Sequence, residues 1–594
     1  MENPTVRINS SIRPTTLLPS PSRRDAIKAL PSSPLFSGNK IFEGYLSYDQ
    51  RVRLSLARAK ALVHAYKLTI DDIANLNQPF WDLHTDPAMA MDTGAGTLVT
   101  IQINLAAGTL VKHVRDHPMI AQLVDDVLAF RVLAHYCLTE VAHGLDAINI
   151  ETTATLLSDG GFDLHSPNPG AAKIMPPTSP CGIPAIGVIF AKLIVKGNDY
   201  GIRPFVLPFN DGKSMMPGIT AKLMPPREGA PPVYHSITAF NHVRLPAYAL
   251  LGPVGSKSAD RALVRANHIS TIWRTAVGGL ALGASMIPAI ERAGYIAGRY
   301  SQRRTVGVPN APKRIPILSF RTQHAPILVA LAQSFVAKEF LKVTLANFKN
   351  PDSDLAVRMA WGTILKATLV DHGKIATSVL SSRMGAQGLF AHNEICSLHT
   401  SILGLSVAEG DVLGLCIRLV SELLQERYHI PPSTDPTSLL ARHEAHLFAE
   451  NQAILRQVGG HRSADFNNLV LPKSELIVRS IGHRMAYDAA VAAGLDGRIT
   501  DLYLAAAVKL DGGWYAEHTD FGSARQDAAE NAAISAALPF LDAWLERTGV
   551  ERYCQVPILT DQNWKFFVDG LREYSSAPSP TSSVPYALPT LAKL

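Results

Sequence analysis

The chain has 594 residues, of which 47% are hydrophobic and 18% are charged, a composition that is ordinary for a globular protein and excludes disorder on this scale. Its length is enough for three or four domains with large cores. The net charge of +6 is small and the basic residues are scattered, which excludes a nucleic-acid-binding surface. The five cysteines lie far apart, which excludes a cysteine zinc motif and a disulfide framework and fits a reducing compartment.

The two ends of the chain carry possible targeting signals. Residues 1–38 are rich in serine, proline and arginine, but their prolines would interrupt the amphipathic helix of a transit peptide. We therefore expect a flexible N-terminal extension. The Ser/Pro-rich tail, residues 575–594, ends in Ala592-Lys593-Leu594, a conservative variant of the peroxisomal Ser-Lys-Leu signal. This ending favours the peroxisome, with the cytoplasm or mitochondrion as alternatives.

Residues 39–133 are expected to form an N-terminal helical domain. Apolar residues recur at intervals of three and four from Val52 to Tyr66, the pattern of an amphipathic helix. Residues 98–111 are apolar with few charges, which is typical of a core helix, and residues 119–130 predict another.

The period changes at about residue 134, and residues 134–252 are expected to form a compact middle β domain. Short runs of β-branched and aromatic residues alternate with turn clusters such as Ser158-Asp159-Gly160-Gly161. The strands are expected at residues 151–156, 187–195, 203–207 and 237–240.

Helical patterns return after residue 258. Residues 261–304 predict one or two long helices, and further helices are expected at 326–348, 355–384 and 412–424, with a glycine-rich break at 385–388. We expect a helical bundle over residues 258–425 and a second C-terminal helical domain over 426–574. The most apolar stretch, residues 275–290, is too short to cross a membrane, so no membrane-spanning helix is expected.

Six segments, taken in chain order, carry a recognisable family pattern. They are Thr139-Glu140 with Gly144 and the Glu151–Thr155 strand, Lys173 with Pro176, residues 240–246 (FNHVRLP), Arg299-Tyr300-Ser301 with Arg304, residues 320–323 (FRTQ) and residues 408–411 (AEGD). Together they resemble the acyl-CoA oxidases, within the acyl-CoA dehydrogenase superfamily. The resemblance implies an α+β fold with an N-terminal helical domain, a middle β domain, a C-terminal helical bundle and an additional C-terminal helical domain.

The resemblance also implies an activity: FAD-dependent desaturation of an acyl-CoA to a trans-2-enoyl-CoA, with the electrons passed to O2 to give H2O2. Such chemistry needs a base for the α-proton, a hydride acceptor and donors to the thioester carbonyl. Glu409 matches the first acid of the family motif and is the expected base. It lies two residues before an apolar-striped helix that Asp411 could cap.

Several residues are expected to bind the FAD. Thr139 is the candidate for the flavin ring and Arg304 for the pyrophosphate, a contact that the resemblance implies from a partner subunit and hence a homodimer. The neighbouring residues Glu140, His143 and Asp146 are expected to hold the loop in place. The remaining candidates for cofactor binding are Gly144, Thr178, Gln387, Gly388 and Asp411, and no metal site is expected.

The sequence also departs from the family pattern. Ile174 and Met175 replace two tryptophans, Pro177 or Thr178 replaces a glycine, and the usual glycine-rich turn is reduced to residues 385–390. These changes indicate a remodelled pocket and leave two rivals open: a dehydrogenase that uses an electron-transfer flavoprotein, and a tailoring desaturase for an unusual acyl or polyketide thioester. A protein of another class, an inactive paralogue acting as a dimer partner, is opposed by the presence of Glu409.

Overall fold

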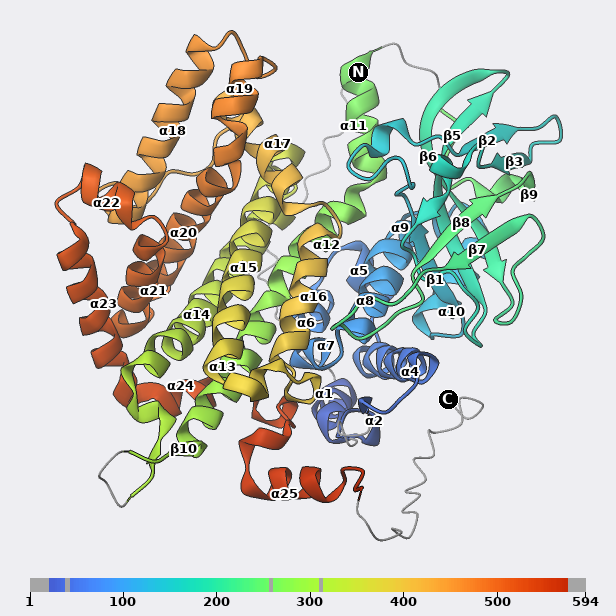
Figure 1. Ribbon diagram of the computed structural model, residues 1–594. Coiled ribbons are helices and arrows are strands. Elements are labelled where there is room, and N and C mark those ends of the chain that lie inside the picture. Colours follow the sequence, from blue (N-terminus) through green and yellow to red (C-terminus); the bar gives the residue numbers. More distant parts are fainter. Residues whose placement is uncertain (1–20, 38–42, 256–259, 309–312, 575–594) are drawn as a thin grey trace, which may run out of the picture.

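A computed structural model of the chain describes residues 21–37, 43–255, 260–308 and 313–574. The N-terminal helices and the strands lie side by side, and the later helices form a bundle and an outer helical layer beside them (Figure 1). The expected order of helical, β, helical and helical parts is confirmed. Residues 1–20 and the tail with Ala592-Lys593-Leu594 lie outside the described residues.

The N-terminal helices cover residues 21–128. Of the expected flexible extension, residues 1–38, the structure describes residues 21–37. This part is mostly helical, and its Phe36 is fully buried. The long helix that follows begins at a capping box in which the Ser47 hydroxyl accepts from the N–H of Gln50. The elements are α1 (Pro21–Ala29), α2 (Pro34–Ser37), α4 (Tyr48–Tyr66), α5 (Ile70–Ala74), α6 (Gln78–His84), α7 (Pro87–Met91), α8 (Thr93–Val99), η2 (Thr100–Ala107), α9 (Gly108–Leu110) and α10 (Pro118–Leu128).

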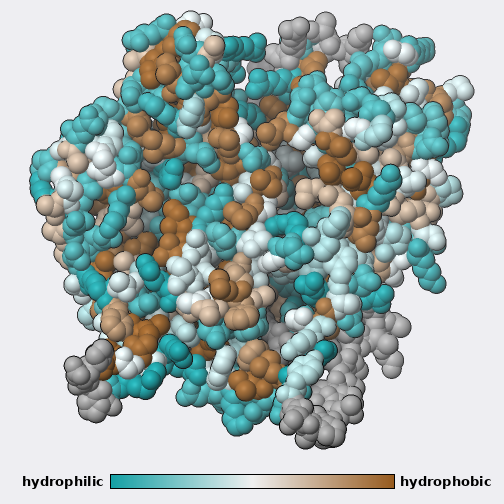
Figure 2. Space-filling view, in the orientation of Figure 1, coloured by the Kyte–Doolittle hydropathy of each residue, from teal (hydrophilic) through white to brown (hydrophobic). Residues whose placement is uncertain are grey.

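The expected core helix of residues 98–111 runs through α8, η2 and α9, and η2 is π-helical. Among the described residues, the helical run Thr93–His113 is the one that is long and apolar enough to cross a membrane by length and composition. However, 78% of its most apolar window is buried inside the protein, as in a core helix. The face of the molecule in Figure 2 carries apolar residues scattered among polar ones.

The middle domain is built on a six-stranded sheet with the strand order β1-β5-β2-β3-β9, and β6 pairs with β5. A three-stranded sheet, β4-β8-β7, packs beside it. The four predicted strands are present as β2, β5, β6 and β8, whereas β1, β3, β4, β7 and β9 were not among those predicted. The strands are β1 (Leu133–Cys137), β2 (Thr153–Leu156), β3 (Phe162–His165), β4 (Lys173–Ile174), β5 (Ala185–Val195), β6 (Asn198–Asn210), β7 (Ile219–Leu223), β8 (Ser236–Phe240) and β9 (Val243–Leu245).

The central bundle consists of α11 (Arg261–Thr271), α12 (Trp273–Ala284), α13 (Met286–Arg303), α14 (Arg321–Lys349), α15 (Leu355–Arg383), α16 (Ile395–Val407) and α17 (Val412–Leu424). Residues 261–304 thus form three helices where one or two were predicted. Helix α17 has the predicted bounds, and α14 starts ahead of Pro326. A hairpin of β10 (Thr305–Val306) and β11 (Ile315–Pro316) follows α13.

The second C-terminal domain packs on this bundle through α20, which contacts α14, α15 and α17. Its helices are α18 (Leu439–Gln457), α19 (Ala464–Leu469), α20 (Ser474–Ala492), α21 (Gly497–Lys509), α22 (Gly512–His518), α23 (Ser523–Ala537), α24 (Leu541–Arg547) and α25 (Asp561–Asp569).

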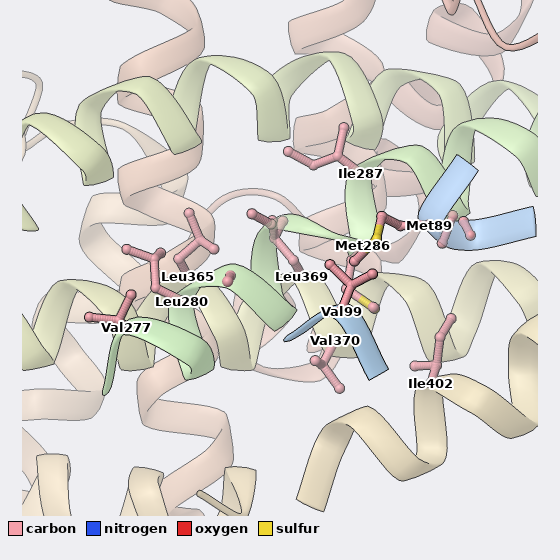
Figure 3. Close-up of a cluster of buried hydrophobic side chains, with 14 of the residues drawn as sticks. Met89, Val99, Val277, Leu280, Met286, Ile287, Leu365, Leu369, Val370 and Ile402 are labelled. Atoms are coloured by element: carbon pink, nitrogen blue, oxygen red, sulfur yellow. The ribbon is translucent and has the colours of Figure 1, made fainter. Parts of the chain in front are cut away.

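One hydrophobic core joins the N-terminal helices to the bundle. Figure 3 shows Val99 of α8 among side chains of α12, α13, α15 and α16, with Met89 and Met286 close together. Burial of a large aliphatic side chain stabilises a fold by about 2 kcal/mol. This shared core therefore fixes α8 and η2 against α12, which is where the candidate site is found.

Candidate functional site

Glu409 lies in the short turn between α16 and α17. Its φ of 52° and that of Gly410, 98°, place both residues in the left-handed region. For a residue with a side chain this conformation costs about 1–2 kcal/mol, and such strain persists where the surroundings enforce it. The predicted cap is present, because the Asp411 carboxylate accepts from the N–H of Gly414 at 2.9 Å. The structure thus gives Asp411 a helix-capping role, while its contact with a cofactor stays a prediction.

The Glu409 carboxylate points between η2 and α12. Its Oε2 accepts a hydrogen bond of 3.1 Å from Nδ2 of Asn104, which also donates to the carbonyl of Arg274 at 3.1 Å. On α12, a Cβ at Gly278 would lie only 1.2 Å from Oε2 of Glu409. Glycine at position 278 is therefore what makes room for the acid.

The surroundings of this carboxylate favour its neutral form. Glu409 as a residue is partly exposed, but protein atoms crowd its carboxyl group, and this burial raises its pKa. The Lys366 cation and the Asn104 hydrogen bond lower the pKa and offset part of the effect. A carboxyl group shifted in this direction suits a general base that works near neutral pH.

Two polar atoms near this acid have no partner. The hydroxyl of Tyr136 on β1 and Oδ1 of Asn104 are buried and make no hydrogen bond within the described parts of the chain. Tyr136 is near enough for the Glu409 charge to add to burial in raising the pKa of its phenol. Buried polar groups are nearly always hydrogen-bonded, so these atoms fit a site that receives a polar ligand.

The loop that follows β1 is anchored by a buried ion pair. Nζ of Lys173 lies 2.8 Å from Oε1 of Glu140, and both side chains are fully buried. The same ammonium donates to the carbonyls of Leu138 at 3.2 Å and Phe190 at 2.7 Å. All three of its donors are used, so Lys173 is structural here.

The Glu140 carboxylate holds the other end of the loop as well. It accepts from the backbone N–H groups of Glu151 at 2.6 Å and Thr152 at 3.0 Å. The His143 ring contacts the Glu151 carboxylate at 3.1 Å and lies 3.5 Å from that of Asp146. The bonds of Glu140 and His143 confirm the expectation that these residues hold the loop, and Asp146 accepts from Nδ2 of Asn149 at 2.7 Å within it.

Thr139 has two hydrogen-bond donors that the loop does not use. Its carbonyl accepts from the N–H of Ile174 at 3.1 Å, whereas its hydroxyl and its own N–H donate to no acceptor among the residues described. Gly144 is exposed, and nothing lies within 4 Å of the position that its Cβ would occupy. Leu145 packs against Gly414, where an added Cβ would lie 3.4 Å from it, so this loop meets the first turn of α17.

The polar groups of Thr178 are bonded inside the β domain. It is fully buried, and its hydroxyl lies 2.6 Å from that of Thr238. Its N–H donates to the Pro176 carbonyl, and its own carbonyl accepts from Nδ2 of Asn210. These bonds give Thr178 a structural role inside the β domain, and its contact with a cofactor in place of the missing glycine stays a prediction.

Arg304 lies directly before β10, which is at the end of the bundle opposite to α17 (Figure 1), and Gln387 and Gly388 lie in the turn that precedes α16. Arg304 is exposed at the end of α13, and its guanidinium makes no hydrogen bond or ion pair within the described residues. Gln387 and Gly388 are separated from Glu409 by the length of α16, about 20 Å at 1.5 Å per residue. Within one chain, these three residues are therefore not brought together with Thr139 and Glu409.

Gly388 has a packing role of its own. A Cβ there would lie 2.0 Å from the Ser381 carbonyl oxygen, so only glycine lets this turn close on the end of α15. The Gln387 side chain accepts from Nδ2 of Asn393 at 2.8 Å. Their cofactor contacts stay predictions.

A narrow cavity of about 50 Å³ begins one helical turn from the Glu409 carboxylate. Thr100 lies one turn before Asn104 on η2, and Ala281 lies one turn after Gly278 on α12, and both line it. Met89 and Met286 line its far part (Figure 3). A larger groove of about 930 Å³ lies between α6, α13 and α14, away from Glu409, and two lysines that line it are paired with Glu291 and Glu339.

Three neighbours of Glu409 were not identified from the sequence: Asn104, Gly278 and Lys366. Asn104 and Lys366 are buried polar residues with apolar neighbours on both sides in the chain, and this local pattern is the signal that could have found them. Gly278 gives no comparable signal, because small residues are common in packed helices. Within the described ranges, no group of three or more His, Cys, Asp or Glu side chains could hold a metal ion.

Comparison with known proteins agrees with this architecture. No family model matches the chain. Over 332 residues the chain is 26% identical to the peroxisomal acyl-coenzyme A oxidase 2 of Oryctolagus cuniculus, which covers 52% of this chain and 48% of that protein. The chain spans about half the length of the curated relatives that it matches.

Solved structures are similar over nearly the whole chain. Acyl-CoA oxidase 1 of Yarrowia lipolytica has a TM-score of 0.77 at 16% identity and covers 94% of this chain and 91% of its own. Acyl-CoA oxidase-2 of Caenorhabditis elegans has a TM-score of 0.76 at 16% identity, with 96% and 92% covered. The chain therefore has the fold of the acyl-CoA oxidases, and its sequence is similar to theirs over about half of its length.

Proposed function

We propose that this protein is an FAD-dependent acyl-CoA oxidase that converts an acyl-CoA to its trans-2-enoyl-CoA. The observation that carries the proposal is the meeting of two segments about 270 residues apart in the sequence. The Glu409 turn brings a buried carboxylate with a raised pKa to the start of α17, and the loop of Thr139 packs on the same helix through Leu145. The Glu409 carboxylate, a candidate base, thus lies beside the loop of Thr139, whose hydroxyl and N–H are unused hydrogen-bond donors.

The residues around this junction fit a flavin. The Thr139 hydroxyl and N–H are free to donate to the carbonyl edge of the ring, and the unpartnered Tyr136 hydroxyl lies three residues earlier in the chain. The neighbouring C. elegans structure contains FAD, ascaroside-CoA and ATP. When bound, FAD would accept the hydride from the substrate β-carbon and deliver the electrons to O2, which becomes H2O2.

Glu409 would take the α-proton of the acyl-CoA. The carboxylate must be ionised to do so, and its raised pKa makes it a stronger base than an exposed glutamate. The N–H of Glu409 donates to no acceptor among the residues described, so it is available to the thioester carbonyl, where negative charge develops. One residue would thus bind the carbonyl and remove the proton.

The acyl chain would enter the narrow cavity between η2, α12 and α16. Its lining combines apolar side chains with hydroxyl groups, and the Thr93 and Ser401 hydroxyls lie 2.7 Å apart. Met89 and Met286 would set the length of acyl chain that fits. The ends of η2 and α12 nearest to Glu409 would then place the α-carbon beside the carboxylate.

The placement of Arg304, Gln387 and Gly388 supports a homodimer as the functional unit. Gln387 and Gly388 lie the length of α16 from Glu409, and Arg304 lies beside β10 at the end of the bundle opposite to α17, so all three would reach the pyrophosphate and adenosine half of FAD from a second copy of the chain. The relative in O. cuniculus is a peroxisomal enzyme, and the chain ends in Ala592-Lys593-Leu594. Both observations support a peroxisomal location.

The test uses the purified protein with its bound flavin. A panel of acyl-CoAs is added without oxygen and the loss of flavin absorbance is followed; O2 consumption and H2O2 are then measured in air. Bleaching by at least one acyl-CoA and fast reoxidation in air are expected. Bleaching with slow reoxidation would replace the oxidase by a dehydrogenase, and a protein that binds no flavin would refute the proposal.

A further inference from the structure

The conformation of the Glu409 turn is held by a side chain from another helix. Lys366 lies in the middle of α15 and is 1% exposed. Its Nζ donates to the carbonyl of Ala408 at 2.6 Å and to that of Gly410 at 2.5 Å. These are the carbonyls immediately before and after Glu409, so one ammonium group clamps both flanks of the acid.

This clamp holds a backbone conformation that is unfavourable by itself. Glu409 and Gly410 are consecutive residues with positive φ, a conformation that a glutamate does not favour by itself. If the turn relaxed to negative φ at position 409, the side chain would leave the space between Asn104 and Gly278. Two hydrogen bonds from a cation are strong enough to fix the turn.

The surroundings of Lys366 fit this role. A Cβ at Gly283 of α12 would lie 2.8 Å from the backbone Cα of Lys366, so glycine at this position lets α12 and α15 approach closely. Burial lowers the pKa of Lys366, and the charges of Glu409, Asp411 and Cys416 oppose the shift. Tyr136 faces Glu409 from the β domain.

We propose that Lys366 is a positioning residue for Glu409: its ammonium clamps the carbonyls of residues 408 and 410 and thereby holds the acid in the left-handed turn that aims it at the substrate. The proposal rests on the proposed function for its consequence in catalysis. The clamp itself is a statement about the backbone and can be tested without substrate.

The substrate-free test is amide hydrogen exchange of peptides that cover residues 405–412. Lys366→Met keeps the length of the side chain and removes its donors, and the turn is expected to exchange at least tenfold faster. Because this variant leaves the Glu409 charge without its cation, the same comparison is made between Glu409→Gln and the double variant Lys366→Met/Glu409→Gln. Lys374→Met, also on α15, serves as the control and should leave the exchange unchanged. Equal exchange with and without Lys366 in both backgrounds would overturn the clamp.

The catalytic test is the rate at which acyl-CoA bleaches the flavin. Lys366→Met should retain its flavin but lose at least 100-fold in rate, and the pH profile of the remaining rate should move to higher pH because the cation no longer favours ionised Glu409. Lys366→Arg should restore part of the rate. A wild-type rate in Lys366→Met would overturn the positioning role. If no acyl-CoA bleaches the wild-type protein, the proposed function fails, while the exchange test still decides whether the clamp exists.

Discussion

Replacing Gly278 by alanine should remove the base without unfolding the protein. The new Cβ would lie 1.2 Å from Oε2 and 2.2 Å from Cδ of Glu409, and 2.5 Å from Nδ2 of Asn104. Ordinary carbon contacts are about 3.5 Å or longer, so the carboxylate must move by about 2 Å. The obstructing atoms are the ends of two side chains, Glu409 and Asn104, that can rotate, and alanine itself favours a helix by about 1 kcal/mol over glycine.

The expected magnitude follows from the role of the displaced group. A positioned base contributes about 10²–10⁴-fold to the rate of proton transfer, and a displacement of 1 Å can already cost 10²-fold. Gly278→Ala should therefore bleach its flavin at least 100-fold more slowly with a good acyl-CoA. Its flavin content and melting temperature should stay close to those of the wild type.

The assay is anaerobic stopped-flow absorbance with the best acyl-CoA of the panel. The matched control is Gly362→Ala on α15, where the new Cβ would lie 3.5 Å from Phe348 and 3.6 Å from Leu280, which are normal contacts. This variant should react like the wild type. A wild-type rate in Gly278→Ala would refute the placement of Glu409 as the base.

Three more outcomes are expected. Glu409→Gln should keep its flavin and lose bleaching by acyl-CoA. Because burial raises the pKa of Glu409, the folded wild type still holds a proton between about pH 5 and pH 8 that the unfolded chain has released, so the stability of the wild type should fall across this range relative to the variant. Melting temperatures of the two proteins that stay parallel across the range would contradict this. Met286→Ala, which enlarges the far part of the cavity, should raise the bleaching rate of longer acyl-CoAs relative to shorter ones; an unchanged ratio would place the acyl chain elsewhere. Lys173→Met leaves Glu140 buried without its partner and should lower the free energy of unfolding by about 3–5 kcal/mol in urea titrations, whereas a loss below about 1 kcal/mol would contradict the anchoring role.

Local patterns in the sequence were sufficient for many elements of the fold. Helix α17 was predicted with its bounds and with Asp411 as its cap, because the apolar stripe and the capping residue lie within a few positions of each other. The start of α14 was predicted too late, at Pro326, because proline is typical of the first turn of a helix, whereas here it lies inside the helix, five residues after the start. Strands β4 and β9 were missed because they have only two and three residues, and β1, β3 and β7 because a histidine or a charged residue interrupts each short apolar run.

Only some residues of the candidate site could be predicted from the sequence. Glu409 and Thr139 follow from motifs, whereas the features that make Glu409 distinctive come from elsewhere in the chain: a hydrogen bond from Asn104, space at Gly278 and the clamp of Lys366. Contacts between helices so far apart leave no local pattern. The assignment of Thr178 came from position in a motif, and its packing against Thr238 could not be foreseen.

The assembly of the Glu409 pocket has a consequence for the order of events during synthesis. Asn104 comes early in the chain, Gly278 in the middle and Lys366 later, and Glu409 is the last of them to leave the ribosome. No fragment that ends before residue 409 holds the acid, and none that begins after residue 104 holds its hydrogen-bond donor. The proposed activity would therefore appear only once the N-terminal helices and the bundle have docked, and turnover would report on the completion of folding across most of the chain.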